Sequence, residues 1–228
     1  MGKCKSIITN IVTIKMKAIK NLLLPLLLTC IIAACNNKPK PNITHTIIDS
    51  ATAAEKNPYV AEDQSPMDMS YFPVDYPLQK MNHLQSSIPP VARVIYSRPH
   101  KKGRVIFGNT AQSLCQYGKA WRLGANEATE IDLFKNVSIN GKNIAKGTYV
   151  LYCIPEADKW TIVFNSNLYT WGLHMDETKD IYKIDIPVMQ QVPAVEDFTM
   201  VFTPAKYGAD LIMAWDNVKA VLPIEFSK

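Results

Sequence analysis

The feature that most constrains the fold is the alternation of apolar and polar residues that runs from about Ile88 to the end of the chain. The segment 182–188 shows it clearly, because Tyr182, Ile184, Ile186 and Val188 alternate with polar residues or proline. A period of two places one set of side chains on the core face of a strand and the other set on the opposite face. No stretch of helical periodicity of similar length competes with this pattern. Residues 88–228 therefore predict an all-β domain.

The expected strands are short and follow one another without helices between them. Asn140-Gly141 is the strongest hairpin signal in the chain. The nearly continuous apolar run 148–154 is typical of a strand buried on both faces. We expect strands at 92–97, 129–134, 137–139, 148–154, 160–164, 182–188, 198–202, 211–215 and 220–226. This order predicts an antiparallel β-sandwich, with a barrel-like closure as the alternative.

Residues 1–34 have the features of an export signal. From Met16, lysines precede an apolar run (22–32) that is too short to span a bilayer, and small residues follow it. The motif Ile32-Ala33-Ala34-Cys35 resembles a bacterial lipobox. That resemblance implies acylation of Cys35 and anchoring in the bacterial cell envelope, the outer membrane being favoured. An ordinary signal peptide with an incidental Cys35 is the alternative, and Met16 is an alternative start.

Two further segments precede the domain. Residues 35–60 are rich in Asn, Lys, Pro, Thr and Ala and predict a tether. In 61–87, Pro66, Pro73 and Pro77 stand among aromatic and acidic residues, a density that argues against a helix and against a central strand. We expect an extended arm lying on the domain, with a free-standing interaction peptide as the alternative.

The net charge of +5 does not indicate a nucleic-acid-binding protein. Residues 1–34 hold five lysines and no acidic residue, so the remaining chain has 20 basic and 20 acidic residues. The surplus of positive charge lies in the segment that we expect to be removed. We therefore expect no nucleic-acid partner.

Positive charge does gather in one part of the domain. No acidic residue lies between Asp75 and Glu127, whereas eight basic residues and all four arginines of the chain do. A guanidinium meets a carboxylate or phosphate with two parallel hydrogen bonds, so a selective use of arginine is a geometric signal. In one interpretation Arg98, Arg104 and Arg122 pair with Glu127, Glu130 or Asp132 and with loop carbonyls. In the other, they face a cleft and bind an anionic group.

Glu127 is the candidate catalytic residue if the protein is an enzyme rather than a binding module. Beside Asn126 and five residues after Arg122, it could act as a general acid or base in a hydrolase or lyase. No set of nucleophile, base and orienting group accompanies it, so an enzyme is not favoured. Trp171, in a glycine-containing loop, is the tryptophan that we expect to be exposed and able to contact a ligand.

The cysteines and histidines indicate no cofactor. Cys115 and Cys153 are able to pair in an exported chain, but two cysteines do not make a disulfide framework and buried free thiols are common in cores. The histidines show no zinc-site spacing. Asp176, Glu177 and Asp180 offer oxygen ligands for Ca²⁺, although such residues more often form a charged surface loop. We expect neither a metal nor a cofactor.

Several segments resemble a known family. They are YSRPHKKGRVIFG (96–108), WRLGANEAT (121–129), NGKNIAKGTYVLYCIP (140–155) and WTIVFN (160–165), in this order. They are similar to a widespread family of uncharacterised exported bacterial proteins and lipoproteins, classed as a domain of unknown function. WRLGANEAT is the most specific segment, and the likeness extends over about 88–226. The resemblance implies a secreted or lipid-anchored β-rich domain and supplies no reaction.

These observations favour a membrane-anchored binding module for an anionic or glycan ligand. Its expected ligand-binding residues are Arg98, Arg104, Arg122, Asn126, Glu127 and Trp171. The alternatives are a hydrolase or lyase that acts on envelope polymers through Glu127, and a structural scaffold of the envelope whose arm docks a partner.

Overall fold

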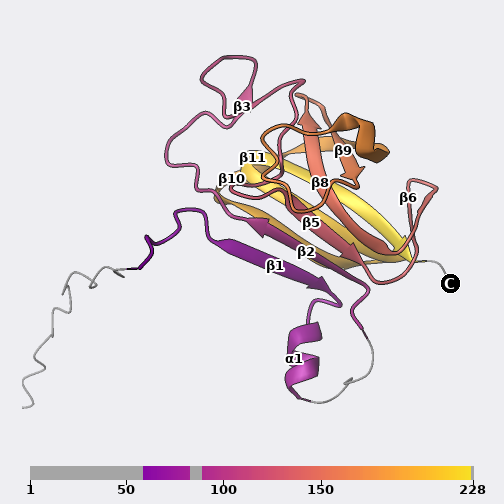
Figure 1. The fold of residues 1–228 in the computed structure, drawn as a ribbon. Coiled ribbons are helices and arrows are strands. Elements are labelled where there is room, and N and C mark those ends of the chain that lie inside the picture. Colours follow the sequence, from indigo (N-terminus) through magenta and orange to yellow (C-terminus); the bar gives the residue numbers. More distant parts are fainter. Residues whose placement is uncertain (1–58, 83–88, 227–228) are drawn as a thin grey trace, which may run out of the picture. The chain divides into compact units, whose positions relative to one another are not determined.

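A computed structural model of the chain describes residues 59–82 and 89–226. The elements found there are mostly strands (Figure 1). In chain order they are β1 (Met67–Phe72), α1 (Tyr76–Met81), β2 (Ala92–Ser97), β3 (Phe107–Gly108), β4 (Cys115–Gln116), β5 (Thr129–Leu133), β6 (Val137–Ile139), β7 (Lys142–Ile144), β8 (Gly147–Pro155), β9 (Lys159–Asn165), the short 3₁₀ helix η1 (Glu177–Lys179), β10 (Asp180–Ala205) and β11 (Gly208–Phe226).

Nine of these strands form one sheet in the order β1-β2-β5-β8-β9-β10-β11-β6-β7. Every pair of neighbours in it is antiparallel, whereas β3 and β4 form a separate small parallel pair. The predicted all-β, antiparallel fold class is therefore confirmed. The large sheet does not close into a barrel, so the barrel-like alternative is wrong.

The long strand β10 joins the two halves of the sheet. Its first part, Asp180–Pro187, pairs with β9, and its second part, from Val188 to Ala205, pairs with β11. The change of partner falls between Pro187 and Val188, and the register shifts between Gln190 and Thr199 are irregularities within the β10–β11 ladder. The expected strands 182–188 and 198–202 are consequently parts of one element, and β11 likewise unites 211–215 with 220–226.

Both halves of the sheet contribute side chains to one hydrophobic core. Aromatic rings dominate one region of it, where the Trp121 ring stacks on Trp215 at 5.8 Å between centroids and meets Phe198 edge-on at 4.9 Å. Trp160 and Trp215 are fully buried. Burying one large aromatic side chain contributes about 1.5–3 kcal/mol, so this region stabilises the part of the domain in which Trp121 lies.

The local patterns on which the fold was predicted are present. Asn140 and Gly141 have φ values of 50° and 75° and connect β6 to β7 as a tight hairpin. In β8, the run from Tyr149 to Cys153 is buried on both faces, as its apolar sequence predicted.

The proline-rich arm is more ordered than expected. β1 lies at one edge of the sheet, which agrees with the exclusion of a central strand. The exclusion of a helix was wrong, because α1 forms directly afterwards. Pro77 stands in the first turn of α1, where the missing N–H has no helical acceptor to lose. The arm is also held by Ser70, whose Oγ accepts a hydrogen bond of 3.1 Å from the Phe202 N–H.

The expected signal segment 1–34, the lipid-bearing Cys35, nearly all of the tether 35–60 and the end of the arm (83–87) lie outside the described residues. Within the described ranges, no helix has the length and apolar character needed to cross a bilayer.

Cys115 and Cys153 are free and buried, so the chain takes the thiol alternative rather than the disulfide. Burial raises the pKa of both thiols, and both are therefore protonated at neutral pH.

Candidate functional site

The loop from Trp121 to Thr129, which contains the most specific sequence motif and which we call the signature loop, is fixed by its backbone. The N–H and C=O of Trp121 pair with those of Cys153 on β8, at 2.7 and 2.8 Å. The Thr129 hydroxyl donates to the carbonyl oxygen of Leu123 at 2.6 Å. Leu123 and Asn126 both have positive φ values, 53° and 56°. This unusual backbone path turns Arg122 and Glu127 outward from a buried base.

Gly172 brings a second loop against the signature loop. A Cβ on Gly172 would lie 2.8 Å from the Cβ of Ala128 and 3.0 Å from that of Arg122, and the residue has a φ of 76°. Only glycine therefore allows the segment 169–173 to approach so closely. The Ala128 N–H donates to the Thr170 carbonyl at 3.1 Å, which fixes the contact.

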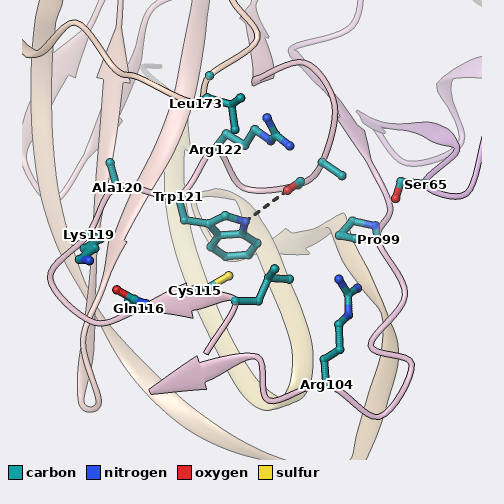
Figure 2. Close-up of a pocket in the computed structure, with 14 residues that line it drawn as sticks. Ser65, Pro99, Arg104, Cys115, Gln116, Lys119, Ala120, Trp121, Arg122 and Leu173 are labelled. Carbon is teal, nitrogen blue, oxygen red and sulfur yellow. Dashed lines mark hydrogen bonds between the residues drawn. The ribbon is translucent and has the colours of Figure 1, made fainter. Parts of the chain in front are cut away.

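A hollow of about 400 Å³ opens between these loops and the segment that carries Arg104 (Figure 2). We call it the basic hollow. It is defined by Arg104, Leu114, Lys119, Trp121, Arg122 and Leu173, with smaller residues between them. Three of the lining residues are basic and none is acidic. In Figure 2, the Trp121 ring lies between Lys119 on one side and Arg104 on the other.

Arg122 is half-buried, and within residues 59–82 and 89–226 no carboxylate lies at ion-pair distance from it. Its Nη1 donates to the carbonyl oxygen of Trp171 at 3.1 Å, and its guanidinium lies 5.9 Å from the centre of the Trp171 ring. Burial lowers the pKa of Arg122, and the more distant charge of Glu127 opposes that shift. The guanidinium stays charged, but it has lost part of its hydration without gaining an ion pair.

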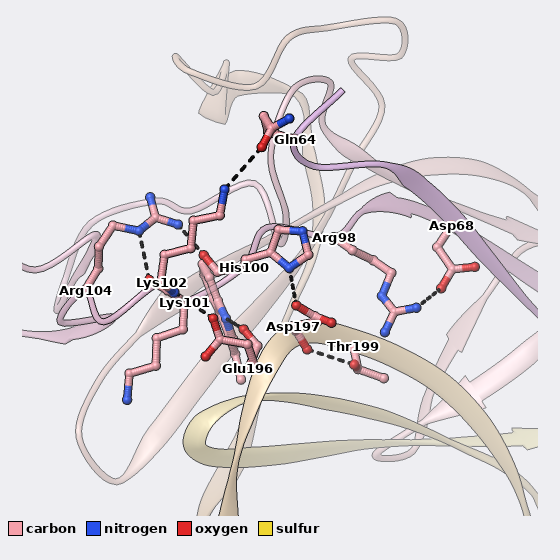
Figure 3. A network of polar contacts seen from close by, with 11 residues as sticks. Gln64, Asp68, Arg98, His100, Lys101, Lys102, Arg104, Glu196, Asp197 and Thr199 are labelled. Carbon is pink, nitrogen blue, oxygen red and sulfur yellow. Dashed lines mark hydrogen bonds and ion pairs between the residues drawn. The ribbon is translucent and has the colours of Figure 1, made fainter. Parts of the chain in front are cut away.

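Arg104 is held by hydrogen bonds to the backbone of its own loop (Figure 3). Its Nε donates to the Lys101 carbonyl at 3.1 Å, and its Nη2 donates to the carbonyl of His100. Among the hydrogen bonds and ion pairs of the described residues, Arg104 has only backbone carbonyls as acceptors. Two of the donor groups of the guanidinium are thereby fixed, while the side chain still lines the hollow.

The loop that carries Arg104 is clamped to β10 and β11 by acidic side chains. His100 pairs with Asp197, and the Lys102 N–H donates to Glu196 Oε1 at 2.7 Å. Lys101 forms an ion pair with Asp216. These contacts fix His100, Lys101 and the backbone of Lys102 against the sheet, and Lys102 Nζ donates to Gln64 at 3.2 Å. Arg104 is the basic side chain of this loop that lines the basic hollow.

The other two arginines have carboxylate partners. Arg93 pairs with Asp132 across the β2–β5 ladder at 2.6 Å, and Arg98 pairs with Asp68 of β1 at 3.1 Å. Neither lines the basic hollow. The two sequence interpretations therefore divide between the arginines, since Arg93 and Arg98 form ion pairs and Arg104 and Arg122 do not.

The remaining candidates lie around the hollow rather than in it. Asn126 Nδ2 donates to Asp63 at 2.8 Å and so attaches the segment before β1 to the signature loop. Trp171 is 52% exposed and is the most exposed of the four tryptophans, as predicted. Its ring packs against Arg122. Glu127 is exposed and faces a different cavity.

That second cavity has a volume of about 440 Å³, and we call it the acidic hollow. Its charged lining residues are Glu127 and Glu130, and its walls are otherwise largely apolar or aromatic. Its larger lining residues are Met67, Ile95, Tyr96, Glu127, Glu130 and Tyr169. A second carboxylate beside Glu127 is what the hydrolase hypothesis requires, and that hypothesis stays a prediction.

Two of the three residues considered for calcium, Asp176 and Asp180, have partners within the fold. Asp176 accepts hydrogen bonds from the backbone and hydroxyl of Thr178 at the start of η1. Asp180 accepts from the Tyr152 hydroxyl and from Asn165. Among the described residues, no group of three or more His, Cys, Asp or Glu side chains could hold a metal ion.

Sequence reasoning did not identify three residues that the geometry makes important: Lys119, Trp121 and Glu130. Lys119 lies in the acid-free stretch and could have been included on that signal. Trp121 and Glu130 carry no local signal, because their roles depend on loops far apart in the sequence meeting at one place.

Comparison with known proteins gives one match. A family model described as "Protein of unknown function (DUF2911)" covers residues 83–224, more than half of the chain. No curated protein and no solved structure matches the sequence. The match spans the strands from β2 to most of β11 and includes the signature loop, which borders both hollows. The chain therefore belongs to the DUF2911 family, as the resemblance to an uncharacterised family implied.

Proposed function

We propose that this domain is a binding module for a small organic anion, which occupies the basic hollow. The main support is that, in the described part of the chain, two of the four arginines form ion pairs with carboxylates and the other two do not. Arg104 and Arg122 are the two arginines without carboxylate partners among the described residues, and they are also the two that line the hollow. An arginine whose charge is not neutralised inside the fold is available to an external anion.

The physical advantage of binding is largest at Arg122. Its charge is partly desolvated, and its hydrogen-bond partner is the carbonyl of Trp171. A carboxylate or phosphate that accepts from the remaining N–H groups would replace lost hydration with charge-assisted hydrogen bonds. Each such bond contributes about 1.5–3 kcal/mol.

The walls of the hollow indicate the rest of the ligand. Trp121, Leu114 and Leu173 supply apolar surface between the three basic groups. The hollow thus offers apolar and charged surface side by side, and a volume of about 400 Å³ suits a small organic ligand that carries both kinds of group. An acidic sugar, an aromatic acid or a phosphate ester fits this description.

Calorimetric titration of the full chain with charged and neutral ligand pairs tests the proposal. Benzoate is compared with benzamide, and glucuronate with glucose, at low ionic strength. We expect the anion of at least one pair to bind and its neutral partner not to bind. Arg122→Ala or Arg104→Ala should weaken binding about tenfold or more, since each removes a charge-assisted contact.

Arg98→Ala is the matched control, because it removes the same charge from the same stretch but leaves the basic hollow intact. It should change the affinity by less than about twofold, as removal of an exposed ion pair has little effect. Equal affinity for both members of each pair, or an Arg104→Ala/Arg122→Ala double variant that binds like the wild type, would overturn the proposal.

The setting of this module is part of the proposal. The lipobox-like motif that ends at Cys35 supports an exported lipoprotein held at an envelope membrane. Partitioning of the full chain between the membrane and soluble fractions of a bacterial host tests it. Wild type should be found with the membrane and Cys35→Ser should not. The same membrane fraction for both proteins would contradict the tether.

A further inference from the structure

The acidic hollow is separate in composition from the basic hollow, although the same two loops border both. Residues 121–128 and 169–173 contribute Arg122 and Leu173 to the basic hollow and Glu127 and Tyr169 to the acidic one. The acidic hollow is completed by β1, β2 and β5, through Met67, Ile95, Tyr96 and Glu130. Its shape thus depends on the ordered arm as well as on the domain.

The two carboxylates of the acidic hollow are not neutralised inside the fold. Within the described residues, neither Glu127 nor Glu130 has a basic side chain at ion-pair distance. Glu130 Oε1 accepts one hydrogen bond, from the Tyr169 N–H at 3.3 Å. Arg122 interacts with Glu127 electrostatically but from beyond ion-pair range.

The walls restrict which cation could enter. Tyr96 is buried, with its ring against Phe198 in the core and its hydroxyl donating to Asp68 at 3.2 Å, so the side chains open to a ligand include Met67 and Tyr169. Ile95 pairs with Glu130 across the β2–β5 ladder, so an aliphatic and an acidic side chain lie next to each other on one face of the sheet. A hydrated metal ion prefers a cage of oxygen ligands, whereas aromatic and aliphatic walls beside carboxylates suit an ammonium group that carries carbon substituents.

We propose that the acidic hollow is a second ligand site, which binds an organic ammonium ion with an apolar substituent. The ammonium group lies between Glu127 and Glu130, and the substituent contacts Ile95, Tyr169 and Met67. This inference does not depend on anion binding in the basic hollow. A molecule that carries both charges could address both hollows, because they are bordered by the same two loops.

The test is a titration of the full chain, followed by NMR chemical shifts, with benzylammonium and its neutral analogue benzyl alcohol. Benzylammonium should bind and shift the resonances of residues that line the acidic hollow. Benzyl alcohol should bind at least about tenfold more weakly. Glu127→Gln/Glu130→Gln should lower the affinity for benzylammonium about tenfold, since the amides keep the shape and remove both charges.

Three control variants show whether benzylammonium binds at these two carboxylates and not elsewhere on the surface. Glu225→Gln makes the same substitution outside the hollow and should leave binding unchanged. Arg122→Ala should weaken binding of the anion that the basic hollow takes by about tenfold or more but should not weaken binding of benzylammonium, so failure of one proposal is distinct from failure of the other. Glu127→Gln alone, at an exposed position, keeps the test valid if the double variant is unstable.

Two results would overturn the inference. One is equal binding of benzyl alcohol and benzylammonium, or an affinity for benzylammonium that is unchanged in the glutamine variants. The other is displacement of benzylammonium by Ca²⁺ at similar concentrations, which would identify the carboxylates as a metal site.

Discussion

At the scale of single residues, the partner of each arginine decides its role. Arg93 and Arg98 meet carboxylates, and Arg104 and Arg122 meet backbone carbonyls. The gathering of arginines is visible in the sequence because it is local. The sequence does not show which arginines form ion pairs. Arg98, for example, pairs with Asp68, which lies thirty residues earlier on the edge strand β1.

Tyr96 allows a prediction of pH dependence at this scale. Burial, with a smaller effect from the charge of Asp68, raises its pKa to about 12. The unfolded value is about 10, so the stabilisation by neutral Tyr96 is complete below pH 10 and is lost as pH rises towards 12. Urea unfolding at pH 9 and pH 11.5 should show a smaller loss of stability in Tyr96→Phe than in wild type.

The exposed Tyr207 is the control for Tyr96. Tyr207→Phe should lose as much stability between the two pH values as wild type does. At pH 9, Tyr96→Phe should itself be less stable by about 1 kcal/mol, because the hydrogen bond to Asp68 is gone. An equal loss with pH in Tyr96→Phe and wild type would show that Tyr96 does not titrate differently in the folded state.

At the scale of elements, alternation predicts strands well but not how long they become. β2 and β6 have the predicted bounds, and β5, β8 and β9 differ by a residue or so at their ends. β10 and β11 each merge two predicted strands, because their ladder continues past the register shifts between Gln190 and Thr199 and both chains stay extended there. The helix α1 was not predicted because the high proline content argued against a helix. The first turn of a helix accepts proline, however, and Pro77 stands there.

The contact between the two site loops gives a second prediction. Gly172→Ala places a methyl group against Ala128 and Arg122 at a φ of 76°. We expect a decrease in the free energy of unfolding of about 1–3 kcal/mol and a weaker affinity for the anion, because Arg122 must move. Urea unfolding and the benzoate titration measure the two effects.

Gly141→Ala separates strain from packing in that experiment. Gly141 has nearly the same φ, 75°, and no atom within 4 Å of an added Cβ. Gly141→Ala should lower the free energy of unfolding by about 1 kcal/mol, which is the effect of the backbone strain alone, and should keep wild-type anion affinity. Equal losses of stability and affinity in the two variants would show that the approach of the loops is unimportant.

At the scale of the whole domain, one apolar core supports two hollows of opposite charge. The core was predictable in kind, because it follows from the alternating pattern that also specified the fold class. The hollows were not, because they form where the loops 121–128 and 169–173 meet the Arg104 segment on one side and β1, β2 and β5 on the other. Sequence alone indicated positive charge in this region and did not separate Arg122 from Glu127, which line different hollows.

The position of a bound anion tests the central claim most directly. A crystal structure of the full chain, grown with the anion that binds most tightly in the titrations, would show where it lies. The account predicts that its charged oxygens lie within hydrogen-bond distance of both Arg104 and Arg122, with its body against Trp121. An anion bound elsewhere, with the basic hollow empty at saturation, would contradict it.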